Sequence, residues 1–405
     1  MDLAQFLKSD LITDNTKELT KNKIFLKTFQ NSKYANDVEN FITPRELLKS
    51  LNLKTKFVGI TGTNGKTTTA FVLSFLLKKL GFSVATQGTE GFFYNLEKKE
   101  EKTLTTPPIL TTIKRAFKYC PDFFVMEVSS HGIVQNRIEG IEFSIKILTS
   151  FSQDHLDFHH SMKEYKKIKE SFFQDDCLKV LKGKIKSKSD FAIVDVDGYD
   201  FKVNSKNLYV LSKPLIEDVS MAGEFNKMNF SLALKSASLI TGENIEDLKD
   251  LLKDFKGVSG RMEVVCKDPL IIVDFAHTPD GIEKVLKSME GKKIVVFGAG
   301  GNRDREKRAL MGEAVSKYAD FAIITNDNPR CENPMEIAKE IQKGVTIPNE
   351  IVLDRQNAIK RGIDLSKKEK ATLFVLGKGD EKYIEFCTKK IPFNDKEVIL
   401  NIIKE

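Results

Sequence analysis

Residues 57 to 69 of this chain read Phe57-Val-Gly-Ile-Thr-Gly-Thr-Asn-Gly-Lys-Thr-Thr-Thr69. The apolar start predicts a buried strand, the glycines a tight turn, and the segment from Lys66 onward a helix. In such a turn, backbone N–H groups and the helix N-terminus together attract a polyphosphate. The Lys66 ammonium would reach the β- and γ-phosphates, and the Thr67 hydroxyl would bind Mg²⁺. ATP or GTP binding is therefore expected, with contacts from Gly62, Thr63, Asn64, Gly65, Lys66, Thr67 and Thr68.

This glycine-rich loop is shorter than the common phosphate-binding loop. Only two residues separate Gly62 from Gly65, where the pattern G-x-x-x-x-G-K-[ST] has four. A turn that merely joins a strand to a helix is the alternative interpretation. The occurrence of strand, turn, lysine, hydroxyl and helix in this order favours a nucleotide site, although such a site does not by itself identify a reaction.

Predicted strands and helices alternate along most of the chain. A helix is expected at 67–80, after the first strand, and helix-like stretches separate the later strands. This alternation predicts an α/β fold with largely parallel sheets. The strands are expected at Phe57–Thr61, Ser83–Gln87, Phe123–Glu127, Ile145–Thr149, Leu270–Asp274, Lys293–Phe297, Phe321–Thr325 and Thr372–Leu376.

The length and the change of pattern near residue 53 predict three domains. A chain of 405 residues is too long for one compact core. Residues 1–52 form a short N-terminal domain, with a strand at 23–29 and a helix at 44–53. The central ATP-binding domain is placed at 53–258, and a smaller α/β domain is placed at 259–405.

Charge and hydropathy limit the class of protein. The excess of 64 Lys and Arg over 57 Asp and Glu is mild, and the lysines are spread along the chain. This balance suits anionic small substrates at least as well as nucleic acid, and no nucleic-acid partner is expected. No run of eighteen apolar residues and no secretory signal occur. A soluble, cytoplasmic monomer without a membrane partner is therefore expected.

Two further features of the composition give simple expectations. The five cysteines have no CxxC spacing and are odd in number, so we expect reduced thiols that are mostly buried. The lysine-rich stretch 179–188 is expected to form a solvated loop or helix face.

Several motifs follow the glycine-rich loop in a fixed order. Met126-Glu-Val-Ser-Ser-His-Gly-Ile-Val-Gln-Asn-Arg137 and Asp154-His-Leu-Asp-Phe-His159 are the most specific. Together the motifs resemble the Mur ligase family, in particular its diaminopimelate- or lysine-adding members, from about residue 56 to residue 381. Further matches are Gly223-Glu-Phe-Asn-Lys-Met-Asn229, Gly260-Arg-Met-Glu263, Val273-Asp-Phe-Ala-His-Thr-Pro-Asp280, Gly298-Ala-Gly-Gly-Asn-Arg-Asp304 and Asp327-Asn-Pro-Arg330.

The resemblance implies an architecture and a reaction. The family has an N-terminal domain for the UDP part of the substrate, a central ATPase with a parallel sheet, and a C-terminal Rossmann-like domain that brings the incoming amino acid. The implied reaction joins meso-2,6-diaminopimelate to the D-glutamate of UDP-N-acetylmuramoyl-L-alanyl-D-glutamate during synthesis of a peptidoglycan precursor. It uses ATP and Mg²⁺, passes through an acyl phosphate, and releases ADP and phosphate.

The same resemblance implies the metal-binding and catalytic residues. Thr67 and Glu127 would hold one Mg²⁺, and His155 would help hold a second one together with Lys169, which the family carries as a carbamate. Glu127 ends an apolar predicted strand, and ligands of open sheets bind at the carboxyl ends of strands. Without the resemblance, a structural histidine pair and an ordinary basic helix face would be the simpler interpretations of His155, His159 and Lys169.

The substrate contacts are also carried over from the resemblance. Asn226 and Asn229 would contact ATP, with Arg261 and Asp274 reaching across a hinge at 257–260; Phe225 stands where the family often has histidine. For the UDP-linked peptide the resemblance implies Thr105, Thr106, Ser129, Gln135 and Arg137, and the stretch Asn15-Thr16-Lys17 faintly resembles the uridine motif, which makes Thr16 a candidate.

The motif Asp327-Asn328-Pro329-Arg330 resembles the version found in ligases that add meso-diaminopimelate. Diaminopimelate has a carboxylate that lysine lacks, and a guanidinium pairs with a carboxylate through two hydrogen bonds. The rest of the pocket would comprise Arg303, Gly377 and Glu381, in a segment where Asp380 replaces the usual histidine.

Three alternatives to this function remain. A lysine-adding relative or a folylpolyglutamate synthetase would share the short loop and the acyl-phosphate route. A nucleotide-switch ATPase would hydrolyse ATP without an added amino acid. A family member without catalytic activity would bind the nucleotide sugar alone, although the residues named for catalysis are all retained.

Overall fold

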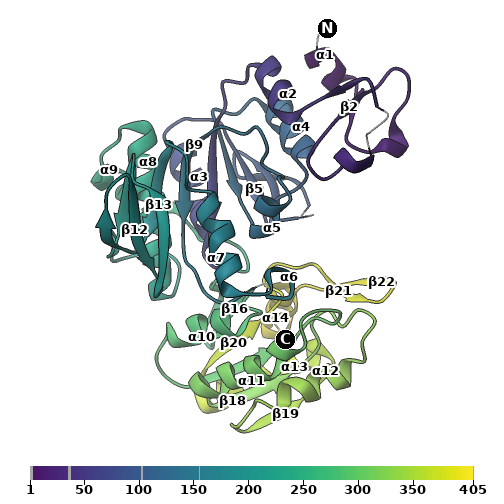
Figure 1. Cartoon of the computed structure of the whole chain (residues 1–405). Coiled ribbons are helices and arrows are strands. Elements are labelled where there is room, and N and C mark those ends of the chain that lie inside the picture. The colour runs from purple at the N-terminus through teal and green to yellow at the C-terminus, as the bar shows by residue number, and fades with distance from the viewer. Residues whose placement is uncertain (1–2, 35–37, 102–103, 155, 405) are drawn as a thin grey trace. The chain divides into compact units, whose positions relative to one another are not determined.

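The computed structural model describes residues 3–34, 38–101, 104–154 and 156–404. The chain forms two compact units, one made of residues 1–217 with 228–255 and the other of 218–227 with 256–405. Both are built of alternating strands and helices around a mostly parallel sheet, as the colours of Figure 1 allow the reader to follow. The α/β fold predicted from the sequence is therefore confirmed, whereas the three domain boundaries stay a prediction.

The main sheet of the first unit has the order β14-β10-β9-β4-β8-β5-β6-β7. The strand that precedes the glycine-rich loop, β4, lies between β8 and β9 and is parallel to both. Only the edge formed by β5, β6 and β7 is antiparallel. The strands are β4 (Lys56–Thr61), β5 (Val84–Gly88), β6 (Gly91–Tyr94), β7 (Glu97–Glu100), β8 (Phe123–Glu127), β9 (Phe143–Leu148), β10 (Leu178–Lys182) and β14 (Leu208–Leu211).

The helices of the first unit cover this sheet. Helix α3 packs on β5 and β8; threonines are buried in its first turn, and mainly apolar side chains are buried along the rest of the helix. Helix α7 begins where the Ser161 hydroxyl accepts a hydrogen bond from the Glu164 N–H. The helices are α3 (Lys66–Lys79), α4 (Ile109–Tyr119), α5 (Ser130–Val134), α6 (Leu156–His159), α7 (Met162–Ser171), α9 (Ile245–Leu251) and η3 (Leu252–Asp254), and α8 (Glu224–Thr241) contributes to both units.

The N-terminal segment forms a small parallel sheet, β1-β2-β3. Its core is not independent, because Leu7, Ile24 and Leu47 belong to one apolar cluster with Ile109 and Ile113 of α4. Burying these side chains together couples the stability of the segment to that of the main sheet. The elements are α1 (Leu3–Lys8), β1 (Ile12–Thr13), η1 (Thr16–Glu18), β2 (Ile24–Leu26), η2 (Ser32–Tyr34), β3 (Phe41–Ile42) and α2 (Pro44–Leu51).

The lysine-rich stretch 179–188 corrects one expectation. It forms β10 and β11 (Lys184–Lys188), not a loop or a helix face. Strand β11 starts the antiparallel sheet β11-β12-β13, whose other strands are β12 (Phe191–Val196) and β13 (Tyr199–Asn204). Lys179 is fully buried, and its ammonium donates to the carbonyls of Cys177 and Lys206. The many lysines concealed the apolar residues that make β10 a central strand.

The sheet of the second unit has the order β15-β16-β20-β17-β18-β19 and is parallel except for β15. One apolar cluster joins it to α10, α11 and α12, and another joins it to α13 and α14, as expected for a doubly wound sheet. The strands are β15 (Glu263–Lys267), β16 (Leu270–Asp274), β17 (Lys293–Phe297), β18 (Phe321–Ile324), β19 (Asn349–Ile351) and β20 (Thr372–Leu376), followed by the hairpin β21 (Tyr383–Phe386) and β22 (Lys389–Pro392). The helices are α10 (Pro279–Lys287), α11 (Glu306–Tyr318), α12 (Pro334–Gln342), α13 (Arg355–Glu369) and α14 (Asp395–Lys404).

The cysteines correct a second expectation. Cys331 and Cys387 form a disulfide. Their segments are far apart in sequence, but a β-bridge between the neighbouring residues Arg330 and Phe386 brings them together. Cys120 is exposed, and the remaining two thiols, Cys177 and Cys266, are half-buried. The prediction of reduced, mostly buried thiols was therefore wrong. Among the described helices, none is both long and apolar enough to cross a membrane.

Candidate active site

The loop after β4 has the geometry that the sequence predicts. Gly62 and Gly65 have φ values of 147° and 87°, which glycine adopts without the strain that a side chain would bring. Their surroundings also exclude a side chain, since a Cβ at Gly62 would lie 2.0 Å from the Thr149 hydroxyl and one at Gly65 would lie 2.4 Å from Oδ1 of Asn229. The Lys66 ammonium donates to the carbonyls of Gly62 and Thr63, at 2.8 and 2.9 Å. The loop therefore curves around its own lysine, with Thr67 and Thr68 buried at the start of α3.

Glu127 is the last residue of β8, beside the end of β4, as the sequence predicts. Its carboxylate is buried and accepts hydrogen bonds from the N–H and the hydroxyl of Thr89, at 3.1 and 3.0 Å. The neighbouring strand β5 ends close to this carboxylate, because a Cβ at Gly88 would lie 2.1 Å from Oε1 of Glu127. Thr89 and Gly88 thus hold this carboxylate at the carboxyl edge of the sheet, and neither residue was predicted from the sequence.

Lys169 of α7 is buried beneath the same edge. Its ammonium donates to the Thr61 hydroxyl at 3.2 Å, and Thr61 is the last residue of β4. Burial, followed by the charge of Lys66, holds the pKa of Lys169 well below its usual value, and Asp154 opposes this shift. Tyr165 lies on the same helix, where burial raises its pKa and its hydroxyl is 3.2 Å from that of Thr63.

The two predicted histidines have different outcomes. His155 lies outside the described residues, so its role stays a prediction. His159 is fully buried, with Nε2 2.8 Å from the Ser130 hydroxyl and its ring stacked on Tyr165. These contacts give His159 a packing role.

Four of the residues predicted for the UDP-linked peptide lie together beside Glu127. The Thr106 hydroxyl donates to the Glu127 carbonyl at 3.0 Å and accepts from the Ser129 N–H at 2.9 Å. Arg137 donates to the Thr106 carbonyl at 2.8 Å, and burial lowers its pKa. Thr105 reaches the Thr89 hydroxyl at 3.2 Å.

The hydrogen-bonding capacity of this cluster is not exhausted. Arg137 Nε and Oε1 of the predicted residue Gln135 are buried without a partner among the residues that the structure describes. Buried polar atoms of this kind are costly unless something binds them.

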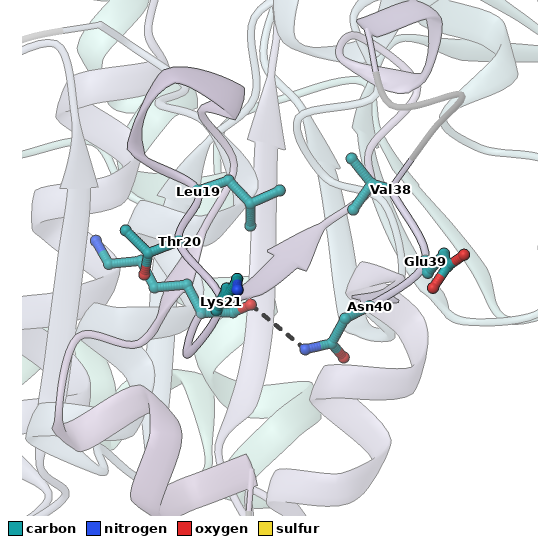
Figure 2. A pocket seen from close by; sticks show the side chains of 7 residues that line it. Leu19, Thr20, Lys21, Val38, Glu39 and Asn40 are labelled. Carbon is teal, nitrogen blue, oxygen red and sulfur yellow. Dashed lines mark hydrogen bonds between the residues drawn. The ribbon is translucent and has the colours of Figure 1, made fainter.

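Thr16 lies away from this cluster, in η1 of the N-terminal segment, next to Asn15, which caps that turn. The turn leads into a hollow of about 250 Å³, shown in Figure 2. Two lysines and one glutamate give it a net positive charge. Its lining residues are Leu19, Thr20, Lys21, Lys23, Val38, Glu39 and Asn40.

In the second unit, the loops after β17, β18 and β20 meet because these strands are neighbours. Asn328 donates from Nδ2 to Glu381 at 2.8 Å, and Gly377 is required where a Cβ would lie 2.6 Å from Oδ2 of Asp327. Arg330 and Arg303 flank Gly300, since a Cβ there would lie 2.9 Å from Nη1 of the first and 3.7 Å from Cγ of the second.

Arg330 is held from two sides. It donates to Glu385 at 3.1 Å and to the Gly301 carbonyl at 2.7 Å, while the carbonyl of the preceding Pro329 packs on Gly301. Glu385 is a member of this site that sequence reasoning missed, since it lies on a hairpin with no recognisable motif. Lys378 was also missed, although it lies between Gly377 and Glu381, which were both predicted for the pocket.

The remaining residues predicted to contact ATP are held by contacts within their own units. Asn229 contacts Gly65 in the first unit. In the second unit, Asn226 donates to the Ala222 carbonyl at 2.6 Å, and Arg261 lies 4.4 Å from the ring of Phe275. The Asp274 carboxylate accepts from two backbone N–H groups, both at 2.7 Å. A shared ATP site formed by the two units stays a prediction.

Comparison with known proteins agrees with this arrangement. Models of the Mur ligase middle domain and of the Mur ligase glutamate ligase domain match residues 60–237 and 260–379. A Wolinella succinogenes protein named UDP-N-acetylmuramoyl-L-alanyl-D-glutamate--2,6-diaminopimelate ligase is 39% identical, over 98% of this chain and 96% of its own. The chain belongs to the Mur ligase family. A Helicobacter pylori family member of the same name is 38% identical, over 96% of this chain and 94% of its own.

Solved structures of other proteins have a fold similar to that of this chain. One titled as the same diaminopimelate ligase has a TM-score of 0.59 at 24% identity, over 97% of this chain and 94% of its own. Mycobacterium tuberculosis folylpolyglutamate synthase complexed with ADP and AMPPCP has a TM-score of 0.63 at 15% identity, over 82% and 91%. At these identities the likeness concerns the fold alone.

Proposed function

We propose that this Mur ligase joins meso-2,6-diaminopimelate to the D-glutamate of UDP-N-acetylmuramoyl-L-alanyl-D-glutamate, a step of peptidoglycan precursor synthesis. The observation that carries the proposal is the full-length similarity to relatives with this name, at 38–39% identity. The phosphate loop and the arginine-bearing pocket of the second unit support it independently. We also propose that the enzyme works as a monomer in the cytoplasm.

The chemistry explains why an ATP site and an amino-acid pocket are both needed. A carboxylate cannot be attacked directly by an amine, because oxide is a poor leaving group. The carboxylate oxygen would attack the γ-phosphorus of ATP, and ADP would leave. The amine, having lost its proton, would then attack the acyl carbon of the acyl phosphate, and phosphate would leave. Phosphoryl transfer depends mainly on position and charge, which the loop 62–68 and Lys66 would supply.

The residues near the loop fit a divalent cation with oxygen ligands. Among the described residues, no three His, Cys, Asp or Glu side chains form a metal cluster. Mg²⁺ does not need one, since it commonly uses one or two carboxylates with phosphate oxygens and water. Thr67 and Glu127 would hold it, and the bound cation would neutralise phosphate charge. His155 would contribute to a second site.

Lys169 would complete that second site as a carbamate. The reaction of its neutral amine with carbon dioxide gives a carbamate anion and a proton, and only the neutral form of a lysine is nucleophilic. The burial of Lys169 and its lowered pKa support this proposal. In carbon-13 bicarbonate, NMR should show a carbamate signal that Lys169→Gln removes and that Lys163→Gln, an exposed position on the same helix, retains. An unchanged carbamate signal in Lys169→Gln would mean that another group carries the carbamate.

For the UDP-linked dipeptide we propose contacts with Thr105, Thr106, Ser129, Gln135 and Arg137. The buried unpaired atoms of the last two support this role. The positive hollow of Figure 2, together with Thr16, is our candidate for the uridine diphosphate part. In both places the ligand would be polar or anionic, which suits amide and guanidinium donors.

The amino-acid pocket would recognise both ends of diaminopimelate. Arg330, with Arg303 beside it, would bind a carboxylate, and Glu381 would bind an ammonium. The assay compares phosphate release and product mass with ATP, Mg²⁺ and the UDP-linked dipeptide, in the presence of meso-diaminopimelate, L-lysine or neither. We expect turnover and a tripeptide mass only with diaminopimelate. Turnover with lysine would refute the specificity, and phosphate release independent of both would refute the ligase.

A further inference from the structure

Lys378 is a lysine with no access to solvent, at the point where the loops of the amino-acid pocket meet. It follows β20, and its side chain has 0% exposure. Lysine is almost never fully buried unless its charge is paired. Its Nζ lies 2.9 Å from Oε2 of Glu381, 3.2 Å from Oδ1 of Asn328 and 3.8 Å from Oδ1 of Asp327. The ammonium therefore donates hydrogen bonds to Glu381 and Asn328, while Asp327 lies at ion-pair distance.

These contacts determine which way the Asn328 amide points. Oδ1 of Asn328 receives hydrogen bonds from the Lys378 ammonium and, at 2.9 Å, from the Glu385 N–H. Neither group can accept a hydrogen bond, so the oxygen must face them. The NH₂ group is thereby directed to Oε2 of Glu381, at 2.8 Å. Lys378 thus orients Asn328 and donates to Glu381 as well.

We infer that Lys378 is the positioning residue of this pocket. It holds Asn328 and Glu381 in the orientation that binds the amino-acid substrate, without contacting that substrate itself. Its burial beneath the two side chains supports an indirect role. The inference rests on the proposed function, because Asn328 and Glu381 are pocket residues only if the chain binds diaminopimelate. It adds a residue that neither the motif nor its spacing singled out.

The charges of the cluster also require Lys378. Its ammonium lies 3.8 Å from Oδ1 of Asp327 and 2.9 Å from Oε2 of Glu381, so it is a cation shared by both carboxylates. With one ammonium between them, the cluster keeps a net charge of −1. That sign suits a site for a substrate ammonium. The Arg330–Glu385 pair beside it is neutral and leaves this balance unchanged.

The test compares Lys378→Met with Lys382→Met, the same substitution at an exposed lysine of the same segment. We expect Lys378→Met to raise KM for diaminopimelate about ten- to hundredfold, the usual effect of losing a charged hydrogen bond and misplacing a contact. KM for ATP and for the UDP-linked dipeptide should stay within about twofold, since both bind elsewhere by this proposal. Lys382→Met should resemble the wild type.

A double-mutant cycle distinguishes a positioning role of Lys378 from a general contribution to the stability of the fold. If Lys378 acts through Glu381, adding Lys378→Met to Glu381→Gln should raise KM little further, so the effects are not additive. Should Lys378→Met not fold, Lys378→Arg keeps the charge but changes the geometry of donation, and we expect it to raise KM for diaminopimelate too.

Two outcomes would overturn the inference. One is an unchanged KM for diaminopimelate in Lys378→Met, or in Lys378→Arg if Lys378→Met does not fold. The other is an equal rise in KM for all three substrates. A wild-type enzyme that does not use diaminopimelate at all would instead refute the proposed function. The two failures are therefore distinguishable.

Discussion

A buried ion pair next to the proposed amino-acid pocket gives the sharpest stability prediction. Arg355, at the start of α13, and Asp395, at the start of α14, both have 0% exposure. Two parallel hydrogen bonds of 2.7 Å join them. The same guanidinium donates, at 3.0 Å each, to the carbonyls of Asn326 and Leu376, which end the segments leading into the pocket loops.

Arg355→Met would leave a buried carboxylate and two buried carbonyls without this partner. Breaking one side of a buried pair costs about 3–5 kcal/mol. For a unit of this size that loss lowers the melting temperature by roughly 10 °C. Replacing both residues, as Arg355→Met with Asp395→Leu, should cost less than the sum of the single changes, because the stranded charge is gone.

The measurement is guanidinium unfolding followed by circular dichroism, since the chain has no tryptophan for fluorescence. Hydrogen exchange of peptides from α13 and α14 would show that the loss concerns the second unit. The control is Arg361→Met on the same helix, whose pair with Glu350 is 49% and 33% exposed and should contribute below about 1 kcal/mol.

Two results would refute this reasoning. One is a loss for Arg355→Met no larger than that for Arg361→Met. The other is additivity of the two changes at Arg355 and Asp395. We also expect the folded Arg355→Met enzyme to have a raised KM for diaminopimelate, because both carbonyl anchors lie next to pocket residues.

Three further predictions concern single side chains. Glu127→Gln should lower Mg²⁺-dependent turnover about 10²- to 10³-fold, as losing one charge-stabilising group does, with nucleotide binding in EDTA retained. Gly88→Ala should raise the Mg²⁺ concentration needed for half-maximal turnover, because its Cβ would lie 2.1 Å from Oε1 of Glu127. The Arg308 guanidinium lowers the pKa of Glu332 from 4.5 to about 2, so this carboxylate stabilises the fold above pH 4.5, and the contribution is lost as the pH falls towards 2. Glu332→Gln should therefore flatten the melting temperature over that range.

Each of these has a clear contrary outcome. Full turnover in Glu127→Gln would exclude this carboxylate from metal binding. An unchanged Mg²⁺ requirement in Gly88→Ala would mean that Glu127 moves without consequence. If the melting temperature of Glu332→Gln falls with acid as steeply as that of the wild type, other carboxylates dominate the acid response.

Local patterns were enough to predict the frame of the nucleotide site. The strand before Gly62, the helix from Lys66 and the position of Glu127 at a strand end all follow from apolar periodicity and turn chemistry. These signals depend only on residues close together in the chain, so they can be recognised in a single sequence. The motif around Arg330 is also a short segment, but it was recognised by resemblance to a family and not by periodicity.

Contacts between distant segments could not be predicted. Lys378 meets Asn328 across 50 residues, and Arg355 meets Asp395 across 40. For the same reason the sequence did not predict the disulfide between Cys331 and Cys387 or the burial of Lys179 in a strand, where reduced thiols and a solvated loop or helix face were expected.

What the sequence determines and what depends on the tertiary structure differ for a physical reason. Apolar periodicity and glycine spacing reflect the backbone geometry of neighbouring residues, and the chain carries them whatever surrounds it. Which side chains share a buried cluster depends on sheet order, which places the ends of β17, β18 and β20 together. A lysine in the sequence is a surface lysine by default, and only the packed structure places Lys378 in a buried cluster with Asn328 and Glu381.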